Sequence, residues 1–348
     1  MQLATFAAFV TRGLEDVAAA EIATGATAID VAEIRTKVLL ARAADPKPFR
    51  RLRTVDDVAV VSAQSPAVET MADLTALIAD DGDLKNAIEI AGRADRMDGS
   101  FSVTVSAAHT ELGPGTEIEQ AAAQAITARY GWQQLQTQQR SPIDVRVFID
   151  GTSALVGVRA FDQPLSRRDY RVVNVRGALR PTVAAALVRL ATPSPKPQRV
   201  WDPFCGSGTV LCEAALMGHE VWGTDIEPEA VDASRANIMT VKREFWGRIE
   251  NADSTSPKTW QKHQTVTAVV SNLPWGKQVA IKSKQALYDT VGSGVADLGR
   301  RGGTGVLLTT EPERIKQRLK REKGIAVDER RIGLLGQTPT ILIVRSAR

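Results

Sequence analysis

The second half of the chain alternates between short apolar runs and segments with helical spacing, and this alternation restricts the fold more than any other feature. From Arg199 onward, amphipathic segments separate runs rich in β-branched residues: "RVWDPF", "EVWGTDI", "VTAVVSNL" and "TGVLLTT". Such alternation predicts a doubly wound, mostly parallel α/β sheet. Two further apolar runs, "KGIAVDERRIGL" and "PTILIVRS", predict a closing pair of strands.

The first 62 residues have a different order of elements. Residues 3–10 alternate as a strand, and residues 13–24 have amphipathic helical spacing that ends at Gly25. Two β-branched strands, a short helical piece and a last strand follow. The order strand, helix, strand, strand, helix, strand predicts a small ferredoxin-like α+β domain over residues 1–62.

Residues 63–163 predict a second α+β domain. "FSVTVSAA" alternates as a strand, and "GTEIEQAAAQAITARYG" reads as a helix capped by Thr116 and terminated by Gly131. "PIDVRVFIDGTSALVGVRAF" predicts two strands joined at Asp150–Gly151, a strong hairpin signal. A basic, irregular linker over 164–180 then leads into the strand–helix domain, for which we expect residues 181–348.

Composition places the chain among globular proteins that need no disulfides. No run approaches the length of a transmembrane helix, and the first residues lack the basic start of a signal peptide. Cys205 and Cys212 form neither a disulfide framework nor a metal motif, so we expect a reducing, cytoplasmic setting, no metal and no membrane partner. We also expect a monomer.

The small net charge of +4 hides an asymmetry between the two halves. Residues 1–165 contain 15 Lys+Arg and 22 Asp+Glu, a net of −7, whereas residues 166–348 contain 29 and 18, a net of +11. A basic surface attracts polyanions such as nucleic acids. For the linker arginines, including Arg167, Arg168 and Arg171, contact with RNA, closure over a cofactor and a purely connecting role all stay open.

Ligands of doubly wound sheets bind at the carboxyl ends of the strands, which directs attention to four stretches. The first, "DPFCGSGT", runs from Asp202 to Thr209. Gly206 and Gly208 let the backbone approach a ligand, and the helix that follows offers free N–H groups. Asp225 ends the next strand, where a carboxylate can accept hydrogen bonds from the hydroxyls of a ribose. Asp253 follows a short strand and can accept from the amino group of an adenine, although a plain loop aspartate explains it equally well.

The fourth stretch is "NLPW", Asn272 to Trp275, at the end of the strand "VTAVVSNL". The exocyclic amine of a purine is a poor nucleophile because its lone pair is delocalised into the ring. Two acceptors, the Asn272 side-chain oxygen and the Leu273 carbonyl, can hold its hydrogens and free that lone pair. Pro274 restricts Leu273 and helps to aim its carbonyl. Trp275 can stack on the base, as aromatic side chains do with unpaired bases.

Together these stretches resemble the class I S-adenosylmethionine-dependent methyltransferases with an (Asn/Asp)-Pro-Pro-aromatic type of motif. "DPFCGSGTVLCEAAL", preceded by "RGALRPTVAAAL", is very similar to one subgroup, the THUMP-domain RNA guanine-N2 methyltransferases, and resembles its tRNA-modifying members. Upstream, residues 63–163 resemble a THUMP RNA-binding domain and residues 1–62 the ferredoxin-like domain that precedes it. Leu273 and Trp275 depart from the commonest motif residues and leave the predicted roles intact.

The resemblance implies S-adenosylmethionine as cofactor, S-adenosylhomocysteine as product and methyl transfer to the N2 amine of a guanine. It also implies a tRNA partner, with the acceptor stem as the target region. The implied cofactor-binding residues are Leu179, Thr182, Asp202, Pro203, Phe204, Cys205, Gly206, Gly208, Asp225, Ile226, Asp253, Ser254 and Asn272. The implied catalytic residues are Asn272, Leu273, Pro274 and Trp275, and the residues expected to touch RNA are Arg167, Arg168, Arg171 and Lys277.

Two other functions stay open, and the motifs argue against two more. A ribosomal RNA guanine-N2 methyltransferase uses the same motif, and a non-catalytic RNA-binding protein is the alternative from another class. A pyrimidine C5 methyltransferase needs a nucleophilic cysteine near Asn272, and no cysteine lies there. A dehydrogenase would need a third glycine after Gly208. The histidines show no metal spacing, and we expect His263 in a solvated loop.

Overall fold

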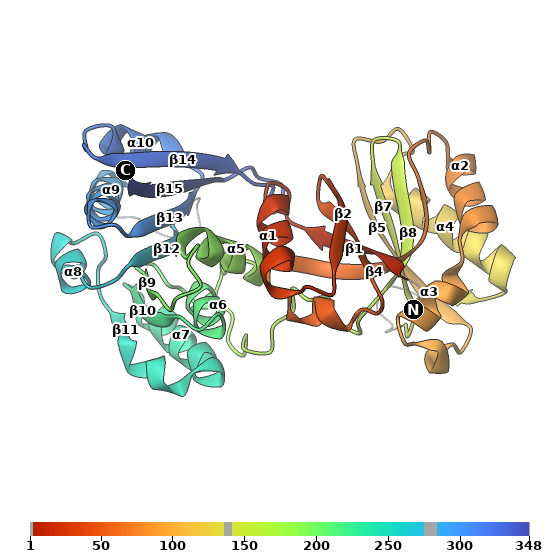
Figure 1. The fold of residues 1–348 in the computed structure, drawn as a ribbon, viewed down its shortest axis with the longest axis horizontal. Helices are drawn as coiled ribbons and strands as arrows, with labels where there is room; N and C mark the ends of the chain where they lie inside the picture. The colour runs from red at the N-terminus through yellow and green to blue at the C-terminus, as the bar shows by residue number, and fades with distance from the viewer. Residues whose placement is uncertain (1–2, 136–140, 275–283, 348) are drawn as a thin grey trace. The chain divides into compact units, whose positions relative to one another are not determined.

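The computed structural model describes all residues except 1–2, 136–140, 275–283 and 348 (Figure 1). The chain divides into two compact units, each with its own sheet and core. Unit 1 consists of Met1–Val10 and Ala18–Leu165, and unit 2 consists of Thr11–Val17 and Ser166–Arg348. Within the described ranges, no helix combines the length and the apolar character needed to cross a membrane.

Unit 1 is built on one mixed sheet of eight strands in the order β2-β3-β1-β4-β8-β7-β5-β6. Its elements are β1 (Ala4–Val10), α1 (Glu15–Gly25), β2 (Asp30–Arg35), β3 (Val38–Ala43), η1 (Lys47–Arg51), β4 (Val55–Ser65), α2 (Met71–Ala76), η2 (Leu77–Asp81), α3 (Leu84–Ile90), η3 (Ala94–Arg96), β5 (Ser100–Ala108), α4 (Gly115–Tyr130), β6 (Gln133–Gln134), β7 (Asp144–Asp150) and β8 (Ser153–Arg159).

The first part of unit 1 has the predicted ferredoxin-like order of elements. β1 pairs with both β3 and β4, and β2 pairs with β3 at the edge. The predicted domain boundary between residues 62 and 63 falls inside β4, which continues to residue 65 and pairs on its other side with β8. One sheet therefore runs through both predicted N-terminal domains.

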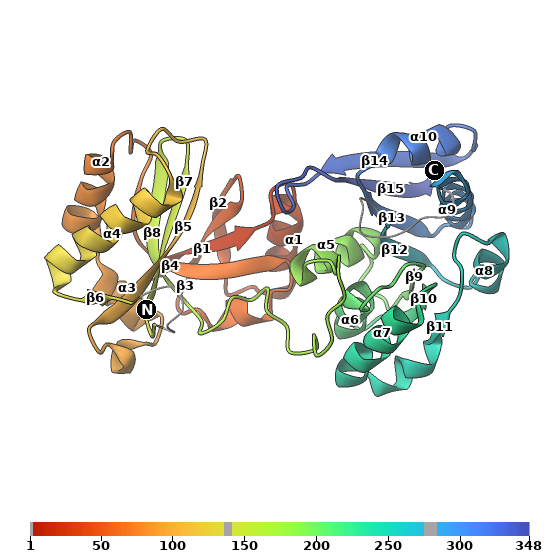
Figure 2. The ribbon, with the colours of Figure 1, turned by 180° about the vertical axis from the view of Figure 1, so that it is seen from behind.

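Local sequence signals explain the second part of unit 1. β7 and β8 form the predicted antiparallel hairpin, with Asp150 opposite Ser153 and Gly151 at φ 63°. Gly131 ends α4 in the left-handed conformation, as predicted. The cap prediction was wrong: Pro114, whose fixed φ suits a helix start, occupies the N-cap and Thr116 lies inside the helix. Figure 2 shows α2 and α4 side by side along β5, β7 and β8.

Unit 2 contains a seven-stranded sheet in the order β11-β10-β9-β12-β13-β15-β14. Its elements are α5 (Pro181–Ala191), β9 (Arg199–Asp202), α6 (Thr209–Leu216), β10 (Glu220–Asp225), α7 (Pro228–Val241), η4 (Arg243–Arg248), β11 (Ile249–Asn251), α8 (Pro257–Lys262), β12 (Ala268–Asn272), α9 (Lys284–Arg300), β13 (Thr304–Thr309), α10 (Pro312–Leu319), β14 (Ile325–Arg331) and β15 (Thr340–Ser346).

The sheet of unit 2 is the predicted doubly wound sheet. β11, β10, β9, β12 and β13 pair in parallel, and β15 runs antiparallel between β13 and β14. Buried side chains of α5, α6 and α7 form a core cluster on one face, whereas those of α9 and α10 form a second cluster on the other. With both faces covered, the central strands β12 and β13 are buried almost throughout, which explains their apolar runs "AVV" and "VLL".

The turn before α1 also packs in unit 2, which the sequence did not predict. Leu14 is 2% exposed and belongs to the same core cluster as Ile332, which follows β14. Arg330 donates to the carboxylate of Asp16, with 2.7 Å between Nη2 and Oδ2. Residues 11–17 are therefore a structural part of the C-terminal unit, although they lie within the predicted first domain.

Candidate active site

The candidate site lies at the carboxyl ends of β9, β10 and β12. The chain goes from β9 outward to β10 and β11, and then returns to place β12 on the other side of β9. In a doubly wound sheet such a reversal opens a crevice beyond the strand ends, where ligands bind. Asp202, Asp225 and Asn272 are the last residues of these three strands. The structure thus brings three of the predicted site residues to one edge of the sheet.

The glycine loop, residues 203–208, joins β9 to α6. Gly206 and Gly208 have φ values of 52° and 75°, in the left-handed region that favours glycine. Gly208 lies so close to α7 that a Cβ atom there would be 2.3 Å from Ser234 Oγ, whereas a Cβ on Gly206 would meet only a methyl of Val175, at 3.8 Å. Packing therefore requires glycine at position 208, whereas the space next to the Cα of Gly206 is free for a ligand.

Cys205 is buried within this loop, and its N–H donates to Thr224 O at 3.0 Å. Burial raises the pKa of its thiol well above the ordinary value, and the nearby carboxylates of Asp202 and Asp225 act in the same direction. A thiol kept protonated is a poor nucleophile. Cys205 therefore serves as a small residue that lets the loop pack against β10.

Asp202 is a buried carboxyl group at the start of the glycine loop, with 2% of its surface exposed. Its Oδ1 accepts from the Ser271 hydroxyl at 2.6 Å and from Phe204 N–H at 3.1 Å. Burial raises the pKa of Asp202 to about 7, and these two hydrogen bonds oppose the rise. A buried acid of this kind is suited to a cationic partner, which would favour its ionised form.

Asp225 is held by backbone N–H groups at the end of β10. Gly206 N–H donates to its Oδ2 at 2.8 Å, and Glu227 N–H donates to its Oδ1 at 3.1 Å. Each carboxylate oxygen can accept a further bond, so capacity remains for the predicted ribose hydroxyls. Ile226 follows with 49% of its surface exposed, an apolar side chain open to a ligand beside Asp225.

Asp253 and its neighbour Ser254 lie after β11 and face different surroundings. Asp253 is exposed, and its Oδ1 accepts from the N–H and the hydroxyl of Thr255 at 2.8 and 2.6 Å. Ser254 is 2% exposed, and its hydroxyl pairs with that of Thr224 at 2.8 Å. Thr224 in turn donates to Pro203 O at 3.2 Å, so Ser254 and Pro203 support the loop from inside.

The described part of the "NLPW" stretch continues from β12. Leu273 is fully buried, and its N–H donates to Leu308 O on β13 at 3.0 Å. Asn272 and Pro274 are half-buried at the strand end. Trp275 and Lys277 lie outside the described residues, so their predicted roles stay predictions.

The remaining predicted residues lie in or next to the linker. Leu179 and Thr182 are buried at the start of α5, and their contact with a cofactor stays a prediction. Arg168 is largely buried, and its Nε donates to Glu213 Oε1 at 3.0 Å. Arg167 is exposed and Arg171 half-buried.

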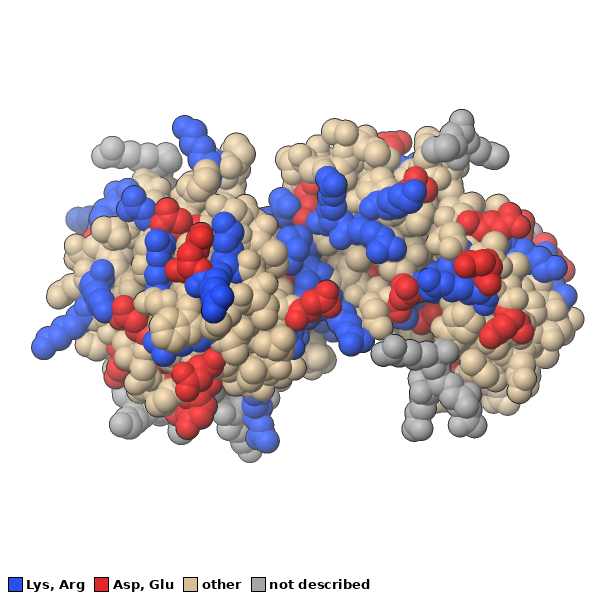
Figure 3. All heavy atoms as spheres, turned by 90° about the horizontal axis from the view of Figure 1, so that it is seen from below, with Lys and Arg blue, Asp and Glu red and all other residues tan. Residues whose placement is uncertain are grey.

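Basic and acidic side chains are interspersed on the face of unit 2 seen in Figure 3, so its excess of arginine and lysine is spread out there.

Two buried polar residues beside the site were missed from the sequence. Glu213 has no exposed surface and lies in α6, and Asn237 is 1% exposed in α7. The available signal was a lone Glu within "GTVLCEAALMG" and a lone Asn on the apolar face of "PEAVDASRANI". Buried polar side chains on such helices need partners, and here both bind the linker.

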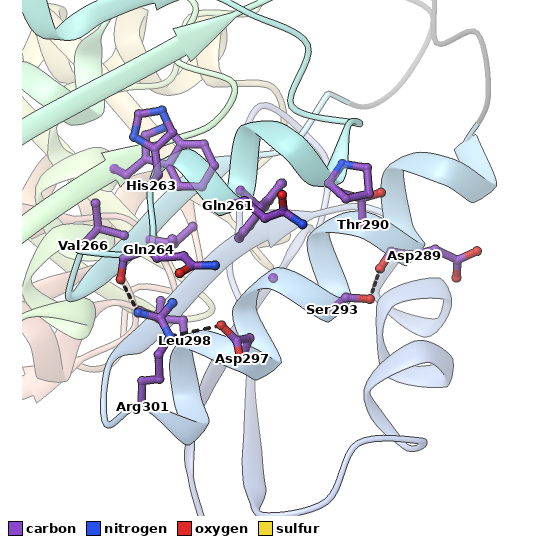
Figure 4. Close-up of a pocket in the computed structure, with 15 residues that line it drawn as sticks. Gln261, His263, Gln264, Val266, Asp289, Thr290, Ser293, Asp297, Leu298 and Arg301 are labelled. Atoms are coloured by element: carbon purple, nitrogen blue, oxygen red, sulfur yellow. Dashed lines mark hydrogen bonds and ion pairs between the residues drawn. The ribbon is translucent and has the colours of Figure 1, made fainter.

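A separate pocket of about 540 Å³ lies where α8 faces α9 (Figure 4). It contains none of the predicted cofactor residues. His263, expected in a solvated loop, lines this pocket and is 6% exposed, stacked on Trp201 with 4.4 Å between ring centroids. That expectation was wrong because "KTWQKHQT" forms a short helix, α8, whose end turns His263 toward the sheet.

Comparison with known proteins agrees with the fold of unit 2. Residues 168–339 match the family model of the RMKL-like methyltransferase domain. A tRNA (guanine(6)-N2)-methyltransferase of Thermus thermophilus is 32% identical over 230 residues, which cover 64% of this chain and 66% of that protein. A ribosomal RNA large subunit methyltransferase K/L of Aliivibrio fischeri is 43% identical over 128 residues, 30% of this chain and 18% of that protein. The chain thus spans just under two thirds of the first relative and under a fifth of the second.

Solved structures show the same fold over almost the whole chain. The crystal structure of TrmN from Thermus thermophilus superposes with a TM-score of 0.76 and 23% identity, covering 99% of this chain and all of that one. The structure of SMU.472, solved in complex with SAH, superposes with a TM-score of 0.71 and 17% identity over 100% and 99% of the two chains. Residues 168–339, just under half of this chain, are thus similar to the RMKL-like methyltransferase domain family.

Proposed function

We propose that this chain is an S-adenosylmethionine-dependent RNA methyltransferase that acts on the exocyclic N2 amine of a guanine in tRNA. Support comes from the glycine loop, the acidic strand ends and the Asn272–Pro274 stretch at one edge of the sheet, together with the guanine-N2 chemistry named for the Thermus relative. The acceptor stem is the proposed target region.

The residues present fit the cofactor. Gly206 keeps an open side next to Asp225, whose carboxylate would accept the ribose hydroxyls. The buried Asp202 suits the ammonium of a methionine moiety, and the exposed Ile226 suits an adenine face. Asp253 would accept from the adenine amine. When bound, S-adenosylmethionine supplies a methyl group activated by its sulfonium.

Asn272 and Leu273 have the task of presenting the target amine. The Asn272 side-chain oxygen and the Leu273 carbonyl accept its two hydrogens, so that its lone pair is free to attack. Leu273 is anchored by its buried side chain and by the bond from its N–H to Leu308 O, and Pro274 restricts it from the other side. Holding the amine in line with the methyl group supplies much of the rate.

The single observation that carries this proposal is the hydrogen bond between Ser271 and Asp202. It joins the end of β12 to the end of β9 at 2.6 Å. Asn272 is the next residue after Ser271, and Asp202 immediately precedes the glycine loop. This bond therefore connects the residue before Asn272, which would hold the amine, to the residue before the glycine loop, which would hold the cofactor.

The test is transfer of a labelled methyl group from S-adenosylmethionine to RNA from cells that lack this protein, followed by nucleoside identification. We expect N2-methylguanosine in the tRNA fraction. Asn272→Ala should reduce transfer by about 10²-fold, the scale for losing one positioned polar group at a reacting centre. Gln317→Ala, at an exposed position of α10 in unit 2, is the matched control and should keep full activity. Cofactor binding without transfer to any RNA would refute an RNA substrate, and no cofactor binding would favour a non-catalytic RNA-binding protein.

A ribosomal RNA substrate is the second candidate, favoured by the similarity to the K/L enzyme. The same experiment separates the two, because labelled N2-methylguanosine would then appear in the ribosomal fraction. A cytoplasmic location and a monomeric state complete the proposal. Light scattering on the purified chain tests the monomer, since a dimer would double the 37.5 kDa mass.

A further inference from the structure

The linker after residue 165 has no regular secondary structure from residue 166 to Arg180, and it passes beside the glycine loop, where Val175 lies near Gly206. A segment of this kind has no ladder of backbone hydrogen bonds, so side chains of neighbouring elements must hold it if it is to keep one position. Two buried side chains of unit 2 do so, one at each end of a short stretch.

The first anchor is Glu213 on α6. Its Oε1 accepts from Arg168 Nε at 3.0 Å and from the Tyr170 hydroxyl at 2.8 Å. Glu213 has no exposed surface and Tyr170 is 6% exposed. Burial raises the pKa of Tyr170 above its ordinary value, and the neighbouring carboxylate adds to the effect, so the phenol stays protonated and donates. This anchor fixes where the linker enters unit 2.

The second anchor is Asn237 on α7, and both the oxygen and the nitrogen of its side-chain amide form hydrogen bonds. Its Oδ1 accepts from Val173 N–H at 2.9 Å, while its Nδ2 donates to Val173 O and to Ser207 O, both at 2.8 Å. An amide group offers two donor hydrogens and one acceptor oxygen, and here each finds a backbone partner. One buried side chain thus ties the linker to the glycine loop.

The position of the tie is specific. Ser207 lies between Gly206 and Gly208, so Asn237 fixes the peptide at the centre of the loop. Two residues after Val173, a methyl of Val175 lies 3.8 Å from the place where a Cβ of Gly206 would be. On its other side, Gly206 N–H binds Asp225. The loop is therefore held by α7, β10 and the linker together.

We propose that Asn237 is a positioning residue for cofactor binding, which holds the linker at Val173 against the glycine loop at Ser207. The inference rests on the proposed function, since it concerns the same cofactor. Without the tie, the loop and the linker over it move independently, and the N–H groups that the cofactor meets lose their preset arrangement. Asn237 is 1% exposed and its side-chain hydrogen bonds go to the backbone of Val173 and Ser207, so it would act through the loop.

Asn237→Asp is the sharpest test, because it preserves size and the acceptor oxygen for Val173 N–H. It removes the Nδ2 donor and turns a carboxylate oxygen toward the carbonyls of Val173 and Ser207. We expect S-adenosylhomocysteine to bind about tenfold more weakly by calorimetry. The rate at saturating cofactor should stay within about twofold of wild type, since the Asn272 end of the site is unchanged.

Ile238→Val is the matched control for a loss of stability alone. Ile238 is the next residue on α7, is fully buried, and loses one methylene in this variant. It should lower the melting temperature without changing cofactor affinity. Should Asn237→Asp fail to fold, Val175→Ala removes the methyl over Gly206 from a half-buried position and should weaken binding by about threefold.

A wild-type affinity in folded Asn237→Asp would overturn the inference, and so would a wild-type affinity in Val175→Ala if Asn237→Asp does not fold. Equal loss of affinity in Ile238→Val would also overturn it, because affinity would then follow stability alone. These outcomes differ from failure of the proposed function, in which the wild-type chain itself binds no S-adenosylhomocysteine.

Discussion

The Ser271 hydroxyl donates to Asp202 Oδ1 at 2.6 Å, across the neighbouring strands β12 and β9. Neither residue is more than 2% exposed. In a buried, low-dielectric setting such a bond is strong and its loss is costly. Burial raises the pKa of Asp202, which precedes the glycine loop, and the bond from Ser271 partly opposes that rise.

Cofactor affinity should depend on pH through Asp202. Burial raises the pKa of Asp202 to about 7, so the carboxyl is largely protonated below that pH and must ionise to pair with an ammonium. Binding of S-adenosylhomocysteine should therefore strengthen from about pH 6 to about pH 7.5 and then level off, by up to roughly tenfold per pH unit below the pKa. Calorimetry across this range measures it.

Asp202→Asn is the control for this pH dependence and also reports on stability. The native pKa lies above the ordinary value of 3.8, so the folded state keeps a proton that the unfolded chain has lost. Asp202 therefore contributes stability at low pH that is lost as pH rises toward about 7. The variant should bind weakly with no slope between about pH 6 and 7.5, and its unfolding free energy should lack this decline. An unchanged slope would assign the titration to another group.

Ser271→Ala should move the pH profile upward. The Ser271 hydrogen bond lowers the pKa of Asp202, so its removal raises that pKa further and shifts the rise of affinity to higher pH. Unfolding should become easier by about 1–3 kcal/mol, the cost of leaving a buried acceptor with one bond fewer. Ser293→Ala in α9 also removes side-chain bonds, to Asp289 O and from Arg318 Nη2, and should leave the pH profile in place. A profile unchanged in Ser271→Ala would contradict the assignment.

Alanine at the two glycines of the loop should separate folding from binding. Gly208→Ala would put a Cβ 2.3 Å from Ser234 Oγ, so it should destabilise unit 2 by more than the ~1 kcal/mol expected for a positive φ alone. Gly206→Ala meets no atom closer than 3.8 Å and should cost only about 1 kcal/mol. It should nevertheless weaken cofactor binding, because its methyl occupies the open side of the loop. Urea unfolding measures the stability of both variants, and calorimetry measures their cofactor affinity. Full affinity in Gly206→Ala would place the cofactor elsewhere.

The strand ends of unit 2 could be predicted because their signals are local. Apolar runs that stop at Asp202, Asp225 and Asn272 mark parallel strands, and their carboxyl ends share one edge of the sheet by topology alone. Gly206 and Gly208 were recognisable because positive φ values need glycine.

Tertiary partners could not be predicted in the same way. No sequence pattern around Glu213 predicts Arg168 or Tyr170 as its partners, and none around Asn237 predicts Val173. His263 was misplaced because a short helix turned it inward. The N-terminal turn around Leu14 was assigned to the first domain because sequence proximity was the only guide.

A buried charge cluster in unit 1 gives a prediction about stability. Arg159 donates to Asp57 Oδ2 at 2.9 Å and lies 2.6 Å from Asp144 Oδ2. Burial raises the pKa of Asp144, and Arg159 opposes the rise. Arg159→Met should cost about 3–5 kcal/mol because it leaves buried carboxylates without their main counter-charge. Arg345→Met breaks the exposed pair with Asp328 and should cost less than about 1 kcal/mol. Equal costs in chemical denaturation would show that the cluster is well solvated.

Gly13 should be essential to unit 2, although it lies near the start of the chain. Its φ is 88°, and a Cβ there would lie 2.3 Å from Arg331 O, a backbone atom at the end of β14. Gly302 has a similar φ of 82° in the same unit and no atom within 4 Å of its Cβ position. Gly302→Ala should therefore cost about 1 kcal/mol, the expense of the backbone conformation alone.

Gly13→Ala carries the same backbone cost and adds a clash that only backbone movement can relieve. Relief would shift the turn that seats Leu14 beside Ile332 and would loosen the core of unit 2. We expect a loss at least about 2 kcal/mol larger than for Gly302→Ala, with faster hydrogen exchange in β14 and β15. Bound S-adenosylhomocysteine should recover part of it, since a ligand of the folded state stabilises that state. Equal losses in the two variants would mean that residues 11–17 rest on unit 2 without supporting it.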